Sequence, residues 1–307
     1  MKKLSDYIIL LAIAAEAAVF TVLAPQFLSL DNAVNIGLSI AIIGILAVGM
    51  TAVILTGGID LSVGSIVALA GVLSALTAQK SGFVVVGVLA AVLTGAFAGA
   101  FTGLVVAQFR VPPFVVTLAL LTIGRGLAFI VTGGRSVGDL PESFTWLGRA
   151  RWLGLPMPVL VMLTIFAAGW FVLTQTTLGR YIYAVGGNRE AAFLAGVKVK
   201  RVTFLVYLLN GLLVGLAGAT LAARLGAGVP NSGVQYELDV IAAVVVGGAS
   251  LNGGRGSVIG TLWGAIFIGV LNNGLNLAGI DPYMQKIALG AVILLAVLAD
   301  QFNKPHS

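Results

Sequence analysis

Side chains that could carry out covalent or metal-assisted chemistry are scarce in this sequence. Its 307 residues include no cysteine, and the only histidine is His306 in the C-terminal tail. No catalytic triad, pair of carboxylates or cluster of metal-ligand residues stands out. Gly248 and Gly253 have the separation found in a phosphate-binding loop, but Gly254 and Arg255 stand where that loop requires Lys and Ser or Thr. We therefore predict that the chain is not an enzyme and binds no metal or cofactor of its own.

Amide and hydroxyl side chains inside otherwise apolar segments are the remaining candidates for a chemical role. Polar residues in such segments can line the path of a solute, although hydrogen bonding between helices is the more ordinary explanation. Asn272 and Asn276 are one helical turn apart on one face. Arg125 is expected to pair with an acidic partner such as Glu16 or to reach the outer surface. The candidates for a solute pathway are Asn35, Ser39, Thr51, Asn210, Asn272, Asn273 and Asn276.

The composition indicates that these residues lie in a membrane. Charged residues make up 9% of the chain and hydrophobic residues 59%, whereas roughly 25% of the residues in a soluble domain are charged. So few charges cannot cover the surface of a soluble globule of this size. The net charge of +6 comes from basic residues scattered between apolar runs, which is typical of cytoplasmic loops and not of a nucleic-acid-binding face. We predict an all-α polytopic membrane protein.

Ten apolar segments are candidates to cross the bilayer, which takes about 20 residues each; eight or nine crossings are alternatives. Ten crossings leave too little chain for a nucleotide-binding domain, so residues 1–307 are predicted to form a single transmembrane domain. Two segments, 64–78 and 238–249, are short and flanked by glycine, which favours tilted or broken helices. The excess of Lys and Arg in alternate loops predicts that both termini are cytoplasmic. The predicted helices lie near residues 7–24, 33–55, 64–78, 83–108, 113–131, 156–173, 202–225, 238–249, 257–277 and 283–299.

Small residues recur at four-residue spacing in three of these segments. They are Gly95, Gly99 and Gly103 in the first, Gly211 and Gly215 in the second, and Gly260 and Gly264 in the third. This spacing puts the glycines on one helix face and predicts close contact between neighbouring backbones.

The longest interior loop, residues 177–201, carries a local signal for contact with a partner protein. Asn188 can cap a short helix, Glu190 suits the first turn of that helix, and Gly196 ends it. A short helix with an Ala, Phe and Leu face on the cytoplasmic surface would fit a groove on a partner. A positively charged connector is the plainer alternative.

Three motifs together resemble a known family. Glu190-Ala191-Ala192-x-x-x-Gly196 resembles the EAA loop of ABC importer permeases, the segment that docks on the ATPase subunit. The stretches 55–65 and 236–257 are similar to the signatures of the ribose/xylose-type monosaccharide permeases, and the resemblance covers nearly the whole chain. It singles out Asn188, Arg189, Glu190, Ala191, Ala192 and Gly196 for ATPase coupling, and Gly57, Gly58, Asp60, Ser62, Gly64, Gly247, Gly248, Gly253, Gly254 and Gly256 in two signature turns.

The resemblance implies a multi-pass permease of the bacterial inner membrane that imports a monosaccharide, ribose-, xylose- or galactose-like. It also implies a second permease copy, in a homodimer or else a heterodimer, an ATPase subunit that holds ATP and Mg, and a periplasmic binding protein that delivers the sugar. Amide and hydroxyl side chains suit a neutral sugar. Asp60 is expected to cap the helix after it, or else to contact the ATPase or line the cytoplasmic exit. The alternative function is an ion-gradient-driven secondary transporter of a small polar solute, a class that usually carries intramembrane acidic residues.

Overall fold

The computed structural model describes residues 2–302, and the side chains of 8–298; His306 lies outside them. The described chain is almost entirely helical, which confirms the predicted all-α class. Its only strands are β1 and β2, which have two residues each and form one hairpin. The elements in order are α1 (Lys2–Leu23), η1 (Pro25–Leu28), α2 (Leu30–Leu55), α3 (Val63–Ser81), α4 (Val84–Phe109), α5 (Pro113–Thr132), α6 (Glu142–Arg149), β1 (Arg151–Trp152), β2 (Leu155–Pro156), α7 (Met157–Gln175), α8 (Thr177–Gly187), α9 (Arg189–Leu194), α10 (Val199–Leu225), α11 (Tyr236–Val246), α12 (Val258–Leu277) and α13 (Pro282–Phe302).

Each of the ten predicted segments overlaps one helix of the structure. Seven of the described helices, α2, α3, α4, α5, α7, α10 and α12, are long and apolar enough to cross a membrane. The apolar parts described for α1 and α13, Ile8–Leu23 and Pro282–Leu298, are shorter. The 11 residues of α11 extend over roughly half of the hydrocarbon core at about 1.5 Å per residue. The number of ten crossings therefore stays a prediction.

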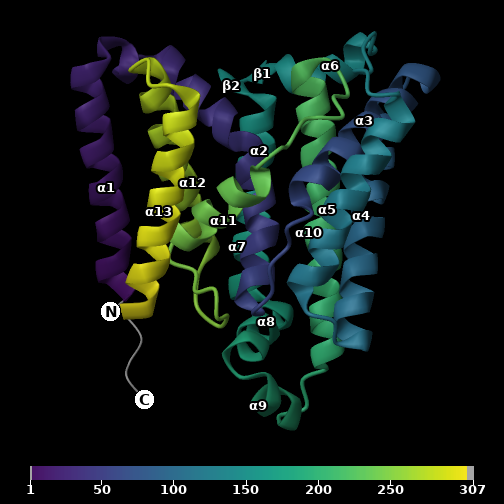
Figure 1. The fold of residues 1–307 in the computed structure, drawn as a ribbon, viewed down its shortest axis with the longest axis vertical. Helices are drawn as coiled ribbons and strands as arrows, with labels where there is room; N and C mark the ends of the chain where they lie inside the picture. Colours follow the sequence, from purple (N-terminus) through teal and green to yellow (C-terminus); the bar gives the residue numbers. More distant parts are fainter. Residues whose placement is uncertain (1, 303–307) are drawn as a thin grey trace.

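Two helices begin inside the bundle and not at its surface. Residues 56–62 are non-helical and connect α2 to α3, and residues 226–235 connect α10 to α11 in the same way. Both α3 and α11 start partway between the two ends of the bundle (Figure 1). The predicted break is thus present before each of these helices, although α3, with 19 residues, is longer than the sequence suggested. Inside a membrane such backbone is tolerated only where protein or water surrounds it, so the two interruptions mark the polar interior of the fold.

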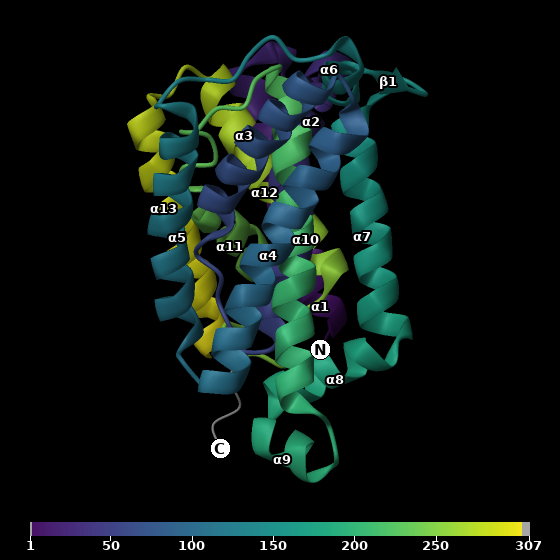
Figure 2. The ribbon, with the colours of Figure 1, turned by 90° about the vertical axis from the view of Figure 1, so that its right-hand side faces the viewer.

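Two of the glycine-spaced segments, in α4 and α10, pack on each other, which confirms the predicted close contact between neighbouring backbones. Figure 2 shows α4 and α10 running side by side. A Cβ atom added at Gly95 would overlap the carbonyl oxygen of Gly211, and one added at Gly211 would overlap that of Gly95. At Gly99 an added Cβ would overlap the carbonyl oxygen of Tyr207. The helices approach this closely because no side chain stands between their backbones.

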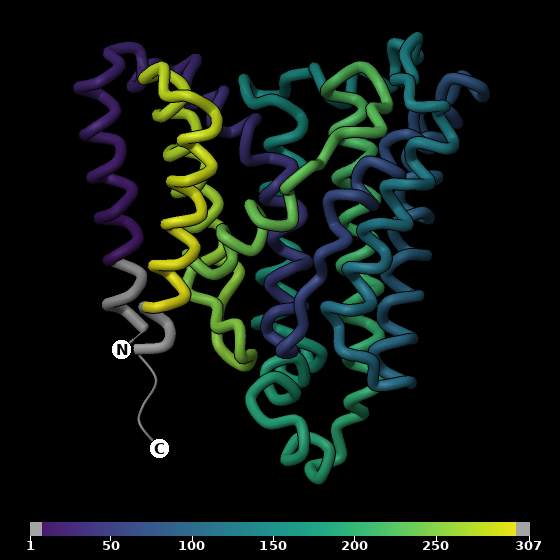
Figure 3. Tube along the Cα trace, in the orientation of Figure 1, coloured from purple at the N-terminus to yellow at the C-terminus, as the bar shows by residue number. Residues whose placement is uncertain are grey.

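The two ends of the bundle carry different elements. At one end lie α8 and α9, together with the connection between α11 and α12, whereas α6 and the β1–β2 hairpin lie at the other (Figures 1 and 3). Helix α1 begins, and helix α13 ends, at the end that carries α8 and α9 (Figure 1). This arrangement agrees with a topology in which both termini share a side with the loop 177–201. The assignment of that side to the cytoplasm stays a prediction.

Candidate coupling site

The short helix predicted in the loop 177–201 is present as α9. The Asn188 side chain caps it, because Asn188 Oδ1 accepts a hydrogen bond from the backbone N–H of Ala191 at 2.9 Å. Glu190 lies in the first turn, where its negative charge interacts favourably with the helix dipole and stabilises the helix. Gly196 follows with a φ of 85°, in the left-handed region that glycine adopts without strain. These local predictions are confirmed.

The side chains of α9 divide into a buried and an open set. Ala192 is 5% exposed and belongs to the main apolar core, so it faces the bundle. Phe193 and Leu194 are 68% and 79% exposed, and α9 is the part of the molecule that projects farthest at its end (Figure 2). The sequence predicted an Ala, Phe and Leu face for contact with a partner. In the structure Ala192 is buried against the bundle, whereas Phe193 and Leu194 are exposed. An exposed apolar pair of this kind is typical of a docking surface.

The C-terminal end of α8 joins both signature turns. A Cβ atom at Gly186 would overlap the carbonyl oxygen of Leu55 and lie 2.7 Å from the backbone nitrogen of Gly254. The Gly254 N–H donates a hydrogen bond to the same Leu55 oxygen at 2.9 Å. Gly253 is equally close to Gly57, since a Cβ at Gly253 would lie 2.9 Å from the Gly57 nitrogen. We call this contact of Leu55, Gly57, Gly186, Gly253 and Gly254 the glycine junction.

The glycine junction connects the segment that leads into α9 with two segments that are distant in sequence. Tyr183, on α8, strengthens the link because its hydroxyl donates a hydrogen bond to the carbonyl oxygen of Gly256 at 2.9 Å. Tyrosine is protonated at neutral pH, and burial raises the pKa of the Tyr183 phenol further above its ordinary value, so the hydroxyl remains a donor. Sequence reasoning found both turns but missed Tyr183 and Gly186, because nothing local marks them as partners of the turns. Helix α8, which leads into α9, therefore contacts both the α2–α3 connection and the α11–α12 connection.

Asp60, in the first signature turn, ties the interrupted segment to α10. Its carboxylate is 4% exposed and accepts hydrogen bonds from the Ser62 N–H at 2.9 Å, the Ser62 hydroxyl at 2.6 Å and the Asn210 amide at 2.8 Å. The bond to the N–H two residues later is the turn that starts α3. The expectation that Asp60 caps α3 is wrong, because the N-cap residue is Ser62 and no side chain in the described part of the chain caps the helix. Asp60 instead closes the turn just before α3, and its burial leaves it no contact with solvent-facing partners.

The other signature glycines serve local packing. Gly247 lies against the carbonyl oxygen of Gly260, at the start of α12, and Gly64 lies against that of Gly233. Gly58 is packed beneath the Tyr207 hydroxyl. Gly248 and Gly256 have φ values of 88° and 144°, in the tight connection between α11 and α12.

Several of the predicted pathway residues make hydrogen bonds between helices. Thr51 bonds to Thr261 at 2.8 Å, and Asn273 exchanges two bonds of 2.9 Å with Asn32. Sequence reasoning missed Asn32 and Thr261. Among the other candidates, Asn210 is bonded to Asp60, Asn272 is half-buried, and Asn35, Ser39 and Asn276 are exposed.

The sequence suggested that Arg125 pairs with an acidic residue such as Glu16. In the structure its side chain instead binds the segment just before α11. Its guanidinium donates hydrogen bonds to the carbonyl oxygens of Pro230 at 2.8 Å and Ser232 at 2.7 Å. These carbonyls belong to the non-helical segment 226–235 and have no partner within a helix, which explains why they capture the cation. The nearby Gln235 has a φ of 70° and an exposed side chain.

The fold and this site define a class: a polytopic helical transport permease with interrupted helices at its centre and a small helix projecting from one end. The chain belongs to the family of branched-chain amino acid transport system permease components, whose model matches residues 32–297. It is a multi-pass membrane transport component and not an enzyme.

The individual relatives carry sugars in their names. The chain is 46% identical to the ribose import permease protein RbsC of Escherichia coli K12, over 95% of this chain and 92% of that protein. It is 45% identical to the ribose import permease protein RbsC of Bacillus subtilis, over 92% of this chain and 88% of that protein. It is 38% identical to the L-arabinose ABC transporter permease protein AraH of Azospirillum brasilense, over 94% of this chain and 85% of that protein. No solved structure matches the chain.

Proposed function

We propose that this chain is the membrane-spanning permease subunit of an ATP-binding-cassette importer for a monosaccharide. The observation that carries the proposal is the 46% identity to a ribose import permease over 95% of the chain. Ribose is accordingly the first candidate, ahead of xylose- and galactose-like sugars. The chain lies in the inner membrane of a bacterium and receives its sugar from a periplasmic binding protein.

Helix α9 is proposed to dock on a separate ATPase subunit, which binds the ATP and Mg. The exposed Phe193 and Leu194 support this role, since apolar side chains that project from a membrane protein toward the cytosol need a protein partner. The glycine junction then transmits closure of the ATPase to the interrupted helices. Two identical copies of the chain are proposed to share two ATPase copies, with both termini in the cytoplasm.

The sugar is proposed to pass along the face that carries the start of α11. Asn231 and Gln235 are exposed there, and Arg125, Glu237 and Asp239 are half-buried beside them. Lipid chains offer no hydrogen bonds to such polar groups partway through the membrane. This face therefore needs contact with water, with a second copy of the chain or with both. Amide side chains suit the hydroxyl groups of a sugar. Asn35, Ser39, Asn272 and Asn276 remain candidates for the outer part of the same path.

A reconstitution experiment tests the function. Vesicles that contain this chain and the ATPase, supplied with binding protein outside and ATP inside, should accumulate labelled ribose or a related monosaccharide. Vesicles with the chain alone should accumulate none under a proton or sodium gradient. Accumulation driven by such a gradient would contradict the proposal and favour the secondary transporter.

A further inference from the structure

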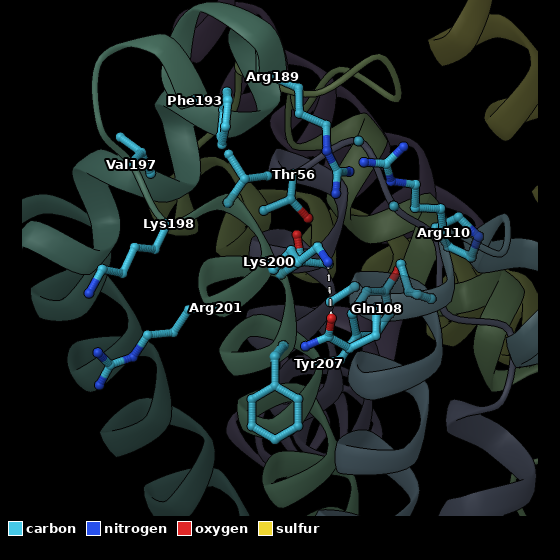
Figure 4. Close-up of a pocket in the computed structure, with 18 of the residues that line it drawn as sticks. Thr56, Gln108, Arg110, Arg189, Phe193, Val197, Lys198, Lys200, Arg201 and Tyr207 are labelled. Atoms are coloured by element: carbon cyan, nitrogen blue, oxygen red, sulfur yellow. Dashed lines mark hydrogen bonds between the residues drawn. The ribbon is translucent and has the colours of Figure 1, made fainter.

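A cleft of about 1130 Å³ lies beside α9, at the end of the bundle that carries the coupling segment. Its walls come from the C-terminal end of α4, the connection to α5, helix α9 and the first turns of α10 (Figure 4). The signature turn contributes Thr56, Gly57 and Gly58 to its inner part. No function has been assigned to this cleft by the sequence motifs or by the coupling role of α9.

The cleft is lined by five basic residues and one acidic one. Figure 4 shows the Arg110, Arg189 and Lys200 side chains extending toward the same part of the cleft, whereas Lys198 and Arg201 extend away from it. Lys200 donates a hydrogen bond to the Gln108 side chain at 3.1 Å. Within residues 8–298, no carboxylate forms an ion pair with Arg110, Arg189 or Lys200. The cleft therefore holds three converging cations that are not ion-paired, and its five basic residues outnumber its single acidic one.

The inner end of the cleft holds hydroxyl groups that lack a partner. Thr203 and Tyr207, both on α10, line the cleft and are 3% and 1% exposed. In the described part of the chain, neither Thr203 Oγ1 nor Tyr207 Oη has a hydrogen-bond partner. Buried hydroxyls are normally satisfied, so two orphaned donors in one cleft indicate a missing acceptor. Cations at the rim and hydroxyl donors at the floor together fit an oxygen-rich anion such as a phosphate group.

Apolar residues at the side of the cleft indicate where the rest of the ligand lies. Leu104, on α4, is 48% exposed, and Val111 and Phe204 are partly exposed beside it. Most of α4 is not buried inside the fold, so this side of the cleft opens toward lipid. A ligand with a phosphate group and an acyl chain would satisfy both parts of the cleft at once. A free phosphate ester would use only the polar part.

We propose that this cleft binds the phosphate group of an anionic phospholipid from the leaflet on the side of α9. The phosphate lies among Arg110, Arg189 and Lys200 and accepts hydrogen bonds from the buried hydroxyls, while the acyl chains follow Leu104 along α4. Basic clefts at the membrane surface are a general means of holding such headgroups. Because Arg189 belongs to α9 and Lys200 to α10, a bound lipid would connect the coupling helix to the bundle. The leaflet is the cytoplasmic one under the proposed function, on which this assignment rests.

Lipid binding by the purified chain provides the test, and it needs neither the ATPase nor the sugar. Native mass spectrometry of the chain in detergent would compare phosphatidylglycerol, phosphatidylcholine and glycerol 3-phosphate. The informative variant is Arg110→Gln with Lys200→Gln. The matched control is Lys198→Gln with Arg201→Gln, which removes the same charge from side chains that extend away.

We expect phosphatidylglycerol to bind the native chain and the control equally, and the R110Q/K200Q variant at least tenfold more weakly. Tyr207→Phe, which removes only the hydroxyl, should weaken binding in the same direction. Equal binding by the two double variants would overturn the proposal, because attraction would then follow net charge alone. Tighter binding of glycerol 3-phosphate than of phosphatidylglycerol would overturn the lipid as ligand. The R110Q/K200Q variant could also bind lipid as tightly as the native chain and yet fail to co-purify the ATPase. That result would assign the cleft to an acidic segment of the ATPase and would overturn the proposal. A failure of sugar uptake would leave the lipid result unaffected, so the two hypotheses are tested separately.

Discussion

Replacing Gly186 by alanine tests the glycine junction with a single methyl group. The added Cβ would overlap the Leu55 carbonyl oxygen and lie 2.7 Å from the Gly254 nitrogen. Both neighbours are backbone atoms, which cannot rotate away as a side chain can. Overpacking of this kind costs about 1–3 kcal/mol. Part of this cost is offset because alanine is favoured over glycine in a helix by about 1 kcal/mol.

Gly187 provides the matched control because it is the next residue of the same helix. An added Cβ at Gly187 meets nothing within 4 Å, so Gly187→Ala gains the helix preference without the overlap. The difference between the two variants therefore isolates the overlap, about 1–3 kcal/mol. It should appear as a lower melting temperature of Gly186→Ala than of Gly187→Ala in detergent.

The same pair of variants tests transmission of movement. In the reconstituted importer, the Gly186→Ala variant should hydrolyse ATP but import less sugar per ATP than the native chain does. The reason is that the C-terminal end of α8 can no longer pack closely between the two signature turns. Gly187→Ala should keep the native ratio. Equal melting temperatures and equal import per ATP in the two variants would refute the reasoning, since the close backbone contact would then have no energetic or mechanical consequence.

Three further predictions concern topology, docking and the buried network. Asn188→Cys, in a chain without native cysteine, should react with a membrane-impermeant thiol reagent in inverted vesicles and not in intact cells; labelling from the periplasm would reverse the topology. Leu194→Glu should abolish co-purification of the ATPase and leave the melting temperature unchanged, because Leu194 is 79% exposed; retained co-purification would exclude this side chain from the interface. Asp60→Ala removes the acceptor used by Ser62 and Asn210, and each buried group left unpaired costs about 1–3 kcal/mol. Its melting temperature should fall well below that of Asp60→Asn, which keeps one acceptor oxygen, and equal values would show that the network is not stabilising.

The sequence alone determined the features that depend on neighbouring residues. Membrane placement follows from the low charge content and the long apolar segments, and the ten predicted helices overlap ten observed ones because helix formation is a local property. The cap at Asn188 and the end of the helix before Gly196 are also local, since each involves residues within one or two turns. The four-residue glycine spacing indicated close packing, although not which helix would be the partner.

Which distant segments meet depends on how the whole helices pack. Gly186 lies at the C-terminal end of α8, Leu55 at that of α2 and Gly254 between α11 and α12, and no periodicity in the sequence links the three. Arg125 was expected to pair with a carboxylate such as Glu16. The fold instead puts the carbonyl oxygens of Pro230 and Ser232 within reach of it, with Glu237 as the nearby acidic residue. A buried polar group bonds to whatever acceptor the packing brings near it, and that acceptor is set by how whole helices are placed. For this reason the chemical types of the site residues are visible in the sequence, whereas their partners are not.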